Sequence, residues 1–248
     1  MAGHSKWANI KHRKGRQDAK RGKIFTKLLK EISIAAREGG GDIDGNARLR
    51  LAVQNAKGSN IPKDTIERAI SKATGADADT YTEVSFEGYG PNGIAVFVEC
   101  LTDNNNRTVS NVRAAFSKYG GSLGTNGSLE FLFERKGVFA VPQPDEFDED
   151  DFTLEVIDAG AEEVEVQEGY VHITSAMEDF GNLQKKLDEL NIVVESAELQ
   201  RIPNTYTELE NDEFTKVWKL IEALEDDDDV QKVYHNMEVK EEQLALVD

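Results

Sequence analysis

Cysteine, proline and long apolar runs are scarce in this sequence. The 248 residues include one cysteine, Cys100, and five prolines. A single cysteine excludes an internal disulfide framework and is typical of a reducing compartment. No stretch approaches the roughly 18 apolar residues that a membrane-spanning helix needs. Residues 1–17 have neither the apolar segment of a secretory signal nor the serine-rich, amphipathic pattern of a mitochondrial presequence. We therefore predict a soluble cytoplasmic protein without a membrane partner.

Motifs of catalysis and cofactor binding are missing as well. The chain has no GxGxxG after a predicted strand, no Walker GxxxxGK[ST], no HExxH and no GxSxG. The glycines of "GGSLGTNGS" precede a predicted strand rather than a helix, so they predict a loop and not a phosphate cradle. None of the four histidines pairs with another at metal-ligand spacing, and there is no CxxC. We predict no enzymatic activity, no catalytic residue, no cofactor and no metal.

We expect Cys100 and the acidic tract 225–229 to have structural roles and no catalytic or metal-binding role. Cys100 ends the apolar run "IAVFVEC" and has no activating neighbour in the sequence, so we expect it to pack as a small apolar side chain. The acidic tract 225–229 lacks the spacing and the central glycine of an EF-hand. We interpret this tract as a solvated loop before the last strand.

Positive charge is concentrated at the N-terminal end of an acidic chain. The whole sequence has 29 Lys and Arg against 47 Asp and Glu, a net charge of -18. Residues 1–75 hold 17 basic against 7 acidic residues, whereas residues 76–248 hold 12 against 40. Such an asymmetry predicts a polyanionic partner for the basic end. The acidic remainder would repel nucleic acid and limit indiscriminate binding.

The periodicity of apolar residues predicts an N-terminal helical domain and a basic arm. Residues 1–17 show neither helical nor strand periodicity and are predicted to be a flexible arm. In residues 18–76, apolar residues recur every three or four positions, which predicts three helices: one from Asp18 to the glycines at 39–41, one over 47–57 and one over 63–73.

After this helical part the period changes to two, and we expect an α+β fold with three domains. Residues 77–135, with a hairpin turn at Asn92-Gly93, and residues 204–248 are predicted to form one discontinuous αβ domain. Residues 136–203 are predicted to be an inserted second αβ domain of ferredoxin-like order. Its predicted elements are strand 136–142, helix 150–160, strands 162–167 and 169–174, helix 178–190 and strand 192–200.

The basic arm and the first helix carry the residues that we expect to bind nucleic acid. Lys and Arg side chains neutralise phosphates and release counterions, and an exposed Trp can stack on an unpaired base. The positive charge continues from the arm onto one face of the first helix, where it forms a stripe of one sign. The candidates are Lys6, Trp7, Lys11, His12, Arg13, Lys14, Arg16, Lys20, Lys23 and Lys27.

The segment "TDNNNRTVSNVR" gives a further candidate, Arg107. Asn and Asp before a helix commonly cap its N-terminus, and capping is the interpretation that we favour for residues 103–106. A polar loop with Arg107 at a helix start can also bind an anion, so both interpretations stay open.

Several long motifs of the sequence resemble one family. "GHSKWANIKHRKGRQDAKRGKIFTKLLKEI", "NARLRLAVQNAKGSNIPKDTIERAI", "FEGYGPNGIAVFVECLTDNNNRTVSNVRAAF" and "GGSLGTNGSLEFLF" closely resemble the YebC/PmpR family. The resemblance implies one helical and two αβ domains, a cytoplasmic location, and neither enzymatic activity nor a cofactor. It also implies one of two roles, because some members are described as probable transcriptional regulatory proteins that bind DNA and others as translation factors acting at the ribosome.

Three hypotheses about function follow. The first is a non-enzymatic, nucleic-acid-binding regulator of gene expression that acts on DNA. The second is a ribosome-associated translation factor that binds ribosomal RNA, because an arm with one aromatic residue suits RNA crevices at least as well as a DNA groove. The third is a protein-interaction module, in which the acidic domains recruit a basic partner. We expect a monomer.

Overall fold

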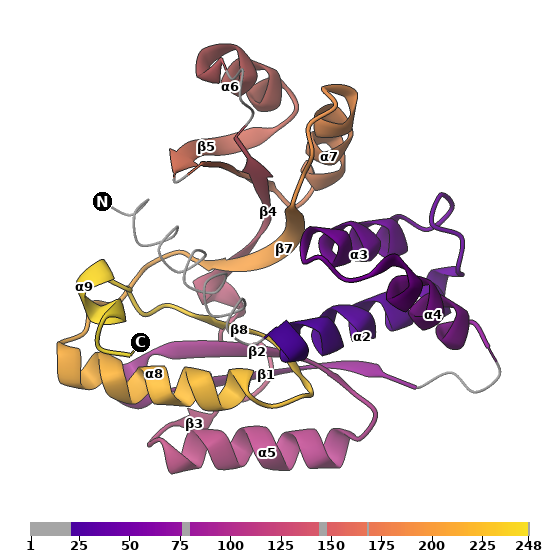
Figure 1. Ribbon diagram of the computed structural model, residues 1–248. Helices are drawn as coiled ribbons and strands as arrows, with labels where there is room; N and C mark the ends of the chain where they lie inside the picture. Colours follow the sequence, from indigo (N-terminus) through magenta and orange to yellow (C-terminus); the bar gives the residue numbers. More distant parts are fainter. Residues whose placement is uncertain (1–20, 76–79, 144–147, 168, 248) are drawn as a thin grey trace. The chain divides into compact units, whose positions relative to one another are not determined.

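The computed structural model describes residues 21–75, 80–143, 148–167 and 169–247 (Figure 1). The predicted arm, residues 1–17, lies outside these described residues. The chain forms two compact units, described separately below. Unit 1 comprises the described residues of Met1–Lys30, Asp79–Glu134 and Ile202–Asp248, and unit 2 those of Glu31–Ala78 and Arg135–Arg201. The predicted domain boundaries stay predictions.

Unit 1 is built on a four-stranded sheet of order β3-β1-β2-β8. Helix α5 (Asn105–Lys118) follows β2, and α8 (Asn211–Glu225) leads into β8. The apolar sides of both helices, including Phe116 and Trp218, pack with β2 and β8 in one buried cluster. The strands are β1 (Thr82–Tyr89), β2 (Ala95–Thr102), β3 (Ser122–Leu123) and β8 (Val230–His235), and the short helix α9 (Glu241–Leu244) follows β8.

The hairpin between β1 and β2 turns at the predicted residues. Thr82 pairs with Thr102 at the open end and Tyr89 with Ala95 next to the turn. Asn92 and Gly93 both have positive φ, 61° and 73°, a conformation that Asn and Gly adopt most readily. The sequence-based prediction of a turn at Asn92-Gly93 is therefore confirmed.

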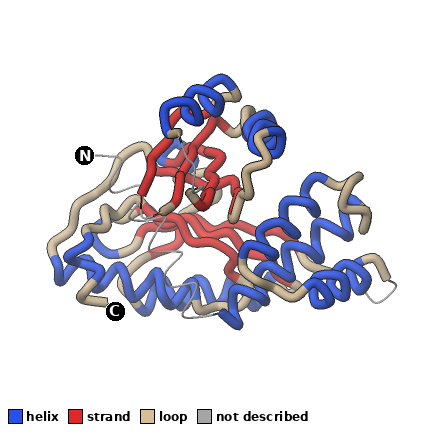
Figure 2. The backbone as a smooth tube through the Cα atoms, turned by 45° about the horizontal axis from the view of Figure 1, so that its top comes forward, coloured by secondary structure: helices blue, strands red, loops and turns tan. Residues whose placement is uncertain are grey.

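Unit 2 contains a second four-stranded sheet, of order β5-β6-β4-β7. Its elements follow the chain as β-α-β-β-α-β, so the predicted α+β class and ferredoxin-like order are confirmed. Both groups of strands are red in Figure 2. The elements are β4 (Phe133–Pro142), α6 (Glu149–Asp158), β5 (Ala161–Gln167), β6 (Tyr170–Ala176), α7 (Phe180–Glu189) and β7 (Ser196–Pro203).

The two sheets are variants of one topology. In unit 2 the first strand, β4, lies between the third and the fourth, β6 and β7. In unit 1 the strand β2 lies in the same way between β1 and β8, but β1 comes first in the chain instead of third. The two sheets therefore share one spatial order of strands but differ in chain order, because the strand of unit 1 that corresponds to β6 precedes the others instead of standing third. The helices correspond too, since α5 and α6 each follow the equivalent strand.

Three helices carry the N-terminal part of the described chain. They are α2 (Arg21–Gly39), α3 (Ala47–Gly58) and α4 (Lys63–Ala73), which confirms the three predicted helices over their described residues. Residues of α2 up to Lys30 belong to unit 1 and those from Glu31 onward to unit 2. Asn46 caps α3 by accepting a hydrogen bond from the Leu49 N–H at 3.1 Å.

Within unit 2, α3 covers the free edge of β7. The Asn55 side-chain amide donates to the Ala197 carbonyl at 2.9 Å and accepts from the Ala197 N–H at 3.0 Å, as a neighbouring strand would. Gly58 permits this approach, because a Cβ there would lie 2.0 Å from the Glu195 carbonyl oxygen. The amide of Asn55 thus ties a helix to the edge of the sheet.

Two strands begin at other residues than predicted. The strand expected at 136–142 begins earlier, because β4 starts at Phe133, directly after a 3-10 turn over Glu130–Leu132. The last strand of unit 2, which the sequence pattern places at 192–200, runs over Ser196–Pro203. In both places apolar residues precede the strand without entering it: Phe131 is 70% exposed and Val193 is 77% exposed.

Candidate nucleic-acid interface

The predicted nucleic-acid residues fall into two groups. Lys6, Trp7, Lys11, His12, Arg13, Lys14, Arg16 and Lys20 lie outside the described residues. Lys23 and Lys27 on α2, and Arg107 on α5, are all described and all belong to unit 1. Only the second group can be placed in the structure.

The α2 lysines contact the carbonyl end of α8. The Lys23 Nζ donates to the Asp226 carbonyl at 2.8 Å and lies 3.3 Å from the Asp226 carboxylate. One turn along α2, the Lys27 Nζ donates to the Glu225 carbonyl at 3.0 Å. The last carbonyls of a helix have no partner within the helix and carry its negative dipole end. The predicted positive stripe therefore neutralises the end of another helix.

Lys30, the next lysine of the stripe, reaches deeper into unit 1. Its Nζ donates to the Asp228 carbonyl at 2.6 Å and lies 3.4 Å from the Asp229 carboxylate. The Lys30 side chain is 11% exposed and that of Asp229 is 5% exposed, so this ion pair is largely shielded from water.

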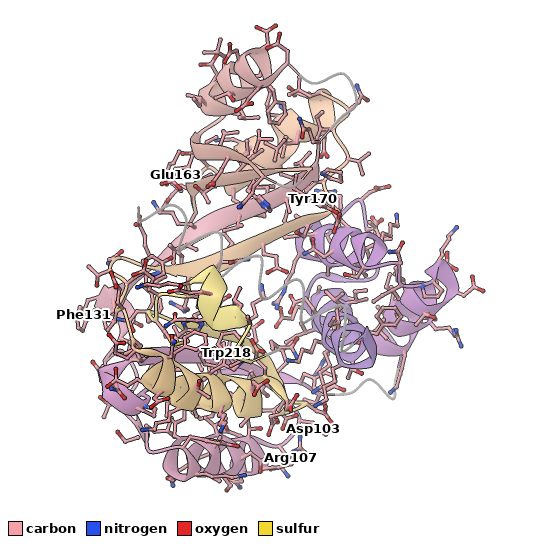
Figure 3. All side chains as sticks on the ribbon, turned by 60° about the vertical axis from the view of Figure 1, so that its left-hand side comes forward. Asp103, Arg107, Phe131, Glu163, Tyr170 and Trp218 are labelled. Carbon is pink, nitrogen blue, oxygen red and sulfur yellow. The ribbon has the colours of Figure 1, made fainter. Side chains whose placement is uncertain are left out.

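Asp229 is the centre of the charged cluster. Arg107 binds the Asp229 carboxylate with Nε at 3.0 Å and Nη2 at 2.7 Å, and the Thr108 hydroxyl donates to it at 2.9 Å. The same guanidinium also binds Asp103 at 2.7 Å (Figure 3). The cluster joins α2, α5 and the residues after α8, three segments that are far apart in the sequence.

The pKa values of the cluster follow from these contacts. Burial alone would raise the pKa of Asp229, but the hydrogen bonds from Arg107 and Thr108 and the charge of Lys30 more than offset it and lower the pKa below its ordinary value. The hydrogen bonds to Asp229 and Asp103 raise the pKa of Arg107. Arg107 is therefore a permanent cation with two carboxylate partners.

The structure corrects the prediction that the acidic tract 225–229 is a solvated loop. We interpreted it as a solvated loop, but Asp229 is buried and the tract accepts hydrogen bonds from three lysines and Arg107. The shortest hydrogen bonds from Lys23, Lys27 and Lys30 go to backbone carbonyls. Backbone carbonyls have no formal charge, so a count of charged residues does not reveal them.

The polar loop before α5 has a structural role, which is to cap the helix through Asn104. Its side chain accepts from the Arg107 N–H at 3.1 Å and so caps α5, which confirms the capping interpretation. The helix start also aims Arg107 at Asp229, and this use of Arg107 had no signal in the sequence. Whether the loop binds an anion as well stays a prediction.

Cys100 is also placed as predicted. It is 3% exposed within the apolar cluster of unit 1, and burial raises the pKa of its thiol to about 12. A thiol with so high a pKa is a poor nucleophile at neutral pH. Among the described residues, no group of His, Cys, Asp and Glu is placed to hold a metal ion. In the same residues, no helix has the length and apolar character needed to cross a membrane.

Replacing Lys27 tests whether the α2 stripe has a structural role. Burial lowers the pKa of Lys27, although the charges of Glu225 and Asp226 oppose the shift. An apolar side chain of similar length removes a costly desolvated charge together with one hydrogen bond, so Lys27→Met should change the free energy of unfolding by less than about 1 kcal/mol. Lys27→Glu should be clearly destabilising, because it places a carboxylate against carbonyls and acidic side chains. Urea denaturation of both variants at pH 7 measures this, and equal effects would contradict the placement of Lys27.

Comparison with known proteins identifies the family. The "TACO1/YebC protein N-terminal domain" matches residues 5–76, and the "TACO1/YebC second and third domain" matches residues 81–237. The chain belongs to the TACO1/YebC family. This confirms the resemblance found in the sequence motifs.

Relatives of this TACO1/YebC protein carry regulatory names. A "Probable transcriptional regulatory protein" of Amoebophilus asiaticus is 59% identical over 239 residues, covering 96% of this chain and 98% of that protein. The "Probable transcriptional regulatory protein YrbC" of Bacillus subtilis is 52% identical, covering 95% and 99%. The crystal structure of the conserved hypothetical protein Aq1575 from Aquifex aeolicus is similar with a TM-score of 0.80 and 41% identity, covering 90% of this chain and 93% of that one.

Proposed function

We propose that this protein is a non-enzymatic, cytoplasmic regulator of gene expression that binds nucleic acid through residues 1–20. The supporting observation is how positive charge is divided along the chain. Residues 1–20 contain six Lys and Arg and one acidic residue, whereas Lys23, Lys27 and Arg107 already have carbonyl or carboxylate partners. A phosphate would have to displace those partners, so we assign the main phosphate contacts to the N-terminal segment. The regulatory names of the relatives support the proposal.

Ribosomal RNA is the second candidate target. Trp7, flanked by Lys6 and followed by five further basic residues up to Lys20, can stack on an unpaired base, which a looped RNA offers and a DNA duplex does not. On this alternative the protein is a ribosome-associated translation factor. The third hypothesis, an interaction module with an incidental basic segment, predicts nucleic-acid affinity that does not depend on residues 1–20.

Salt dependence tests the phosphate contacts. Lys11→Ala and Arg13→Ala should each reduce the slope of log K against log[salt] by about one, if each side chain neutralises one phosphate. Lys27→Met is the matched control, because the Lys27 ammonium group already donates a hydrogen bond to the Glu225 carbonyl. The salt slope of this variant should equal that of the unmodified protein. Fluorescence anisotropy between 50 and 300 mM KCl measures all three. A slope that is unchanged in the Lys11 and Arg13 variants would refute their assignment.

Substitutions of Trp7 test whether the protein binds unpaired bases or duplex nucleic acid. Trp7→Ala should cost about 1–3 kcal/mol of binding free energy on single-stranded or looped RNA and little on duplex DNA. Trp7→Phe keeps a stacking ring and should retain most of the affinity. Titration of both variants against a hairpin RNA and a duplex DNA of equal length measures the difference. An equal loss on the two targets would argue against stacking.

A further inference from the structure

Helix α6 of unit 2 has an apolar outer face. Phe152 and Val156 point into the core of unit 2 and are 8% and 0% exposed. Leu154 lies between them in sequence, two residues from each, so helical geometry turns it to the opposite side. Leu154 is 64% exposed, and Ile157, one turn further on, is 50% exposed. The side of an amphipathic helix that normally carries polar residues thus presents two large aliphatic side chains.

Acidic side chains surround this pair. Asp150, Asp151 and Asp158 on α6 are exposed, and the helix has no basic residue. The surrounding sequence is acidic as well, since residues 135–201 contain five Lys and Arg against eighteen Asp and Glu. Of the five, Lys186 is paired with Glu155 of α6 itself. The field around Leu154 and Ile157 is therefore negative.

We propose that Leu154 and Ile157 form the centre of a docking surface for a basic amphipathic segment of another protein. An apolar centre inside a polar rim is the usual anatomy of a protein interface. The acidic rim selects the charge of the partner, because it attracts Lys and Arg and repels the phosphates of nucleic acid. A second copy of this chain is a poor occupant, since it would bring the same acidic rim. This surface is independent of the proposed nucleic-acid function.

A defined peptide tests the proposal on the full chain. The probe is a fluorescent 14-residue helix-forming peptide with Leu on one face and Lys on the other, titrated at 100 mM KCl. The double variant Leu154→Ser/Ile157→Ser should raise its Kd at least about tenfold, because central apolar contacts dominate interface energetics. Both side chains are exposed, so the variant should fold. Val193→Ser is the matched control, since Val193 is 77% exposed in the same unit but not on α6, and should leave Kd unchanged.

Three outcomes would overturn the proposal. One is equal binding by the double variant and the unmodified protein. Another is equal binding of a peptide with Ser in place of Leu, since that would mean attraction by charge alone. The third is concentration-dependent dimerisation, seen by sedimentation and abolished by Leu154→Ser/Ile157→Ser, which would make a second copy the occupant. The nucleic-acid affinity of the double variant, expected to be unchanged, keeps this test separate from that of the N-terminal segment.

Discussion

Deletion of residues 1–17 is expected to abolish tight nucleic-acid binding while leaving the fold intact. The deletion removes Lys6, Lys11, Arg13, Lys14 and Arg16, five permanent cations. If each neutralises one phosphate, the slope of log K against log[salt] should fall by about 3.5 on single strands and about 4.5 on duplex DNA. At 0.1 M salt this corresponds to a loss of affinity of several orders of magnitude. Residues 1–17 show neither helical nor strand periodicity in the sequence, so the thermal unfolding midpoint should change little.

A charge-matched control separates the deletion from an effect of net charge alone. Replacing five exposed acidic residues of unit 2 with Gln changes the net charge by the same amount in the opposite direction. That variant should bind nucleic acid slightly better and keep its salt slope, because the slope counts phosphate contacts and not net charge. Affinity that survives the deletion would support the third hypothesis, in which the basic segment is incidental.

The second large effect is expected at Asp229, far from residues 1–17 in the sequence. Asp229→Asn keeps the size of the side chain but removes the charge that Arg107 and Lys30 share. Breaking a buried ion pair from one side leaves the other charge uncompensated, so the variant should lose about 3 kcal/mol of stability. For a chain of this length that lowers the unfolding midpoint by roughly 6–12 °C. Asp226→Asn is the matched control. Asp226 is 48% exposed and its partner Lys23 is 41% exposed, so the loss should stay below about 1 kcal/mol.

The pH dependence of stability gives an independent check on Asp229. Its pKa in the folded protein is lower than that of an ordinary Asp, which is about 3.9. The stabilisation is therefore present above pH 4 and is lost as pH falls toward the folded-state pKa. The unmodified protein and Asp229→Asn should differ most near neutral pH and converge in acid. A difference that is constant from pH 7 to pH 3 would contradict an ionised Asp229 at the centre of the cluster.

Local patterns predicted most of the fold. The helix expected at 47–57 runs over Ala47–Gly58, and the one expected at 63–73 runs over Lys63–Ala73. Periodicity, caps and the Asn92-Gly93 turn are properties of short windows, and they determine elements of this kind. The start of β4 at Phe133, three residues before the predicted start at 136, could not be found in this way, because apolar residues occur both in the 3-10 turn and in the first part of the strand.

The charged cluster had no equivalent local signal. The spacing of Lys23, Lys27 and Lys30 predicts one positive face, but their partners lie about two hundred residues further along the chain. Several of those partners are backbone carbonyls, which every residue type has, so the sequence does not mark them. A stripe of positive charge can therefore bind the carbonyl end of a helix in the same protein as well as a phosphate backbone. For the α2 lysines, only the fold shows that their partners are carbonyls and carboxylates of the same chain.

Crosslinking in living cells tests the central claim most directly. The full chain and the chain without residues 1–17 would be crosslinked with ultraviolet light, purified under denaturing conditions and the attached nucleic acid sequenced. We predict abundant crosslinks for the full chain and background levels for the deletion. Enrichment of one ribosomal RNA region would identify a translation factor, and enrichment of promoter DNA a transcriptional regulator. Equal recovery of nucleic acid with and without residues 1–17 would contradict the assignment of binding to this segment.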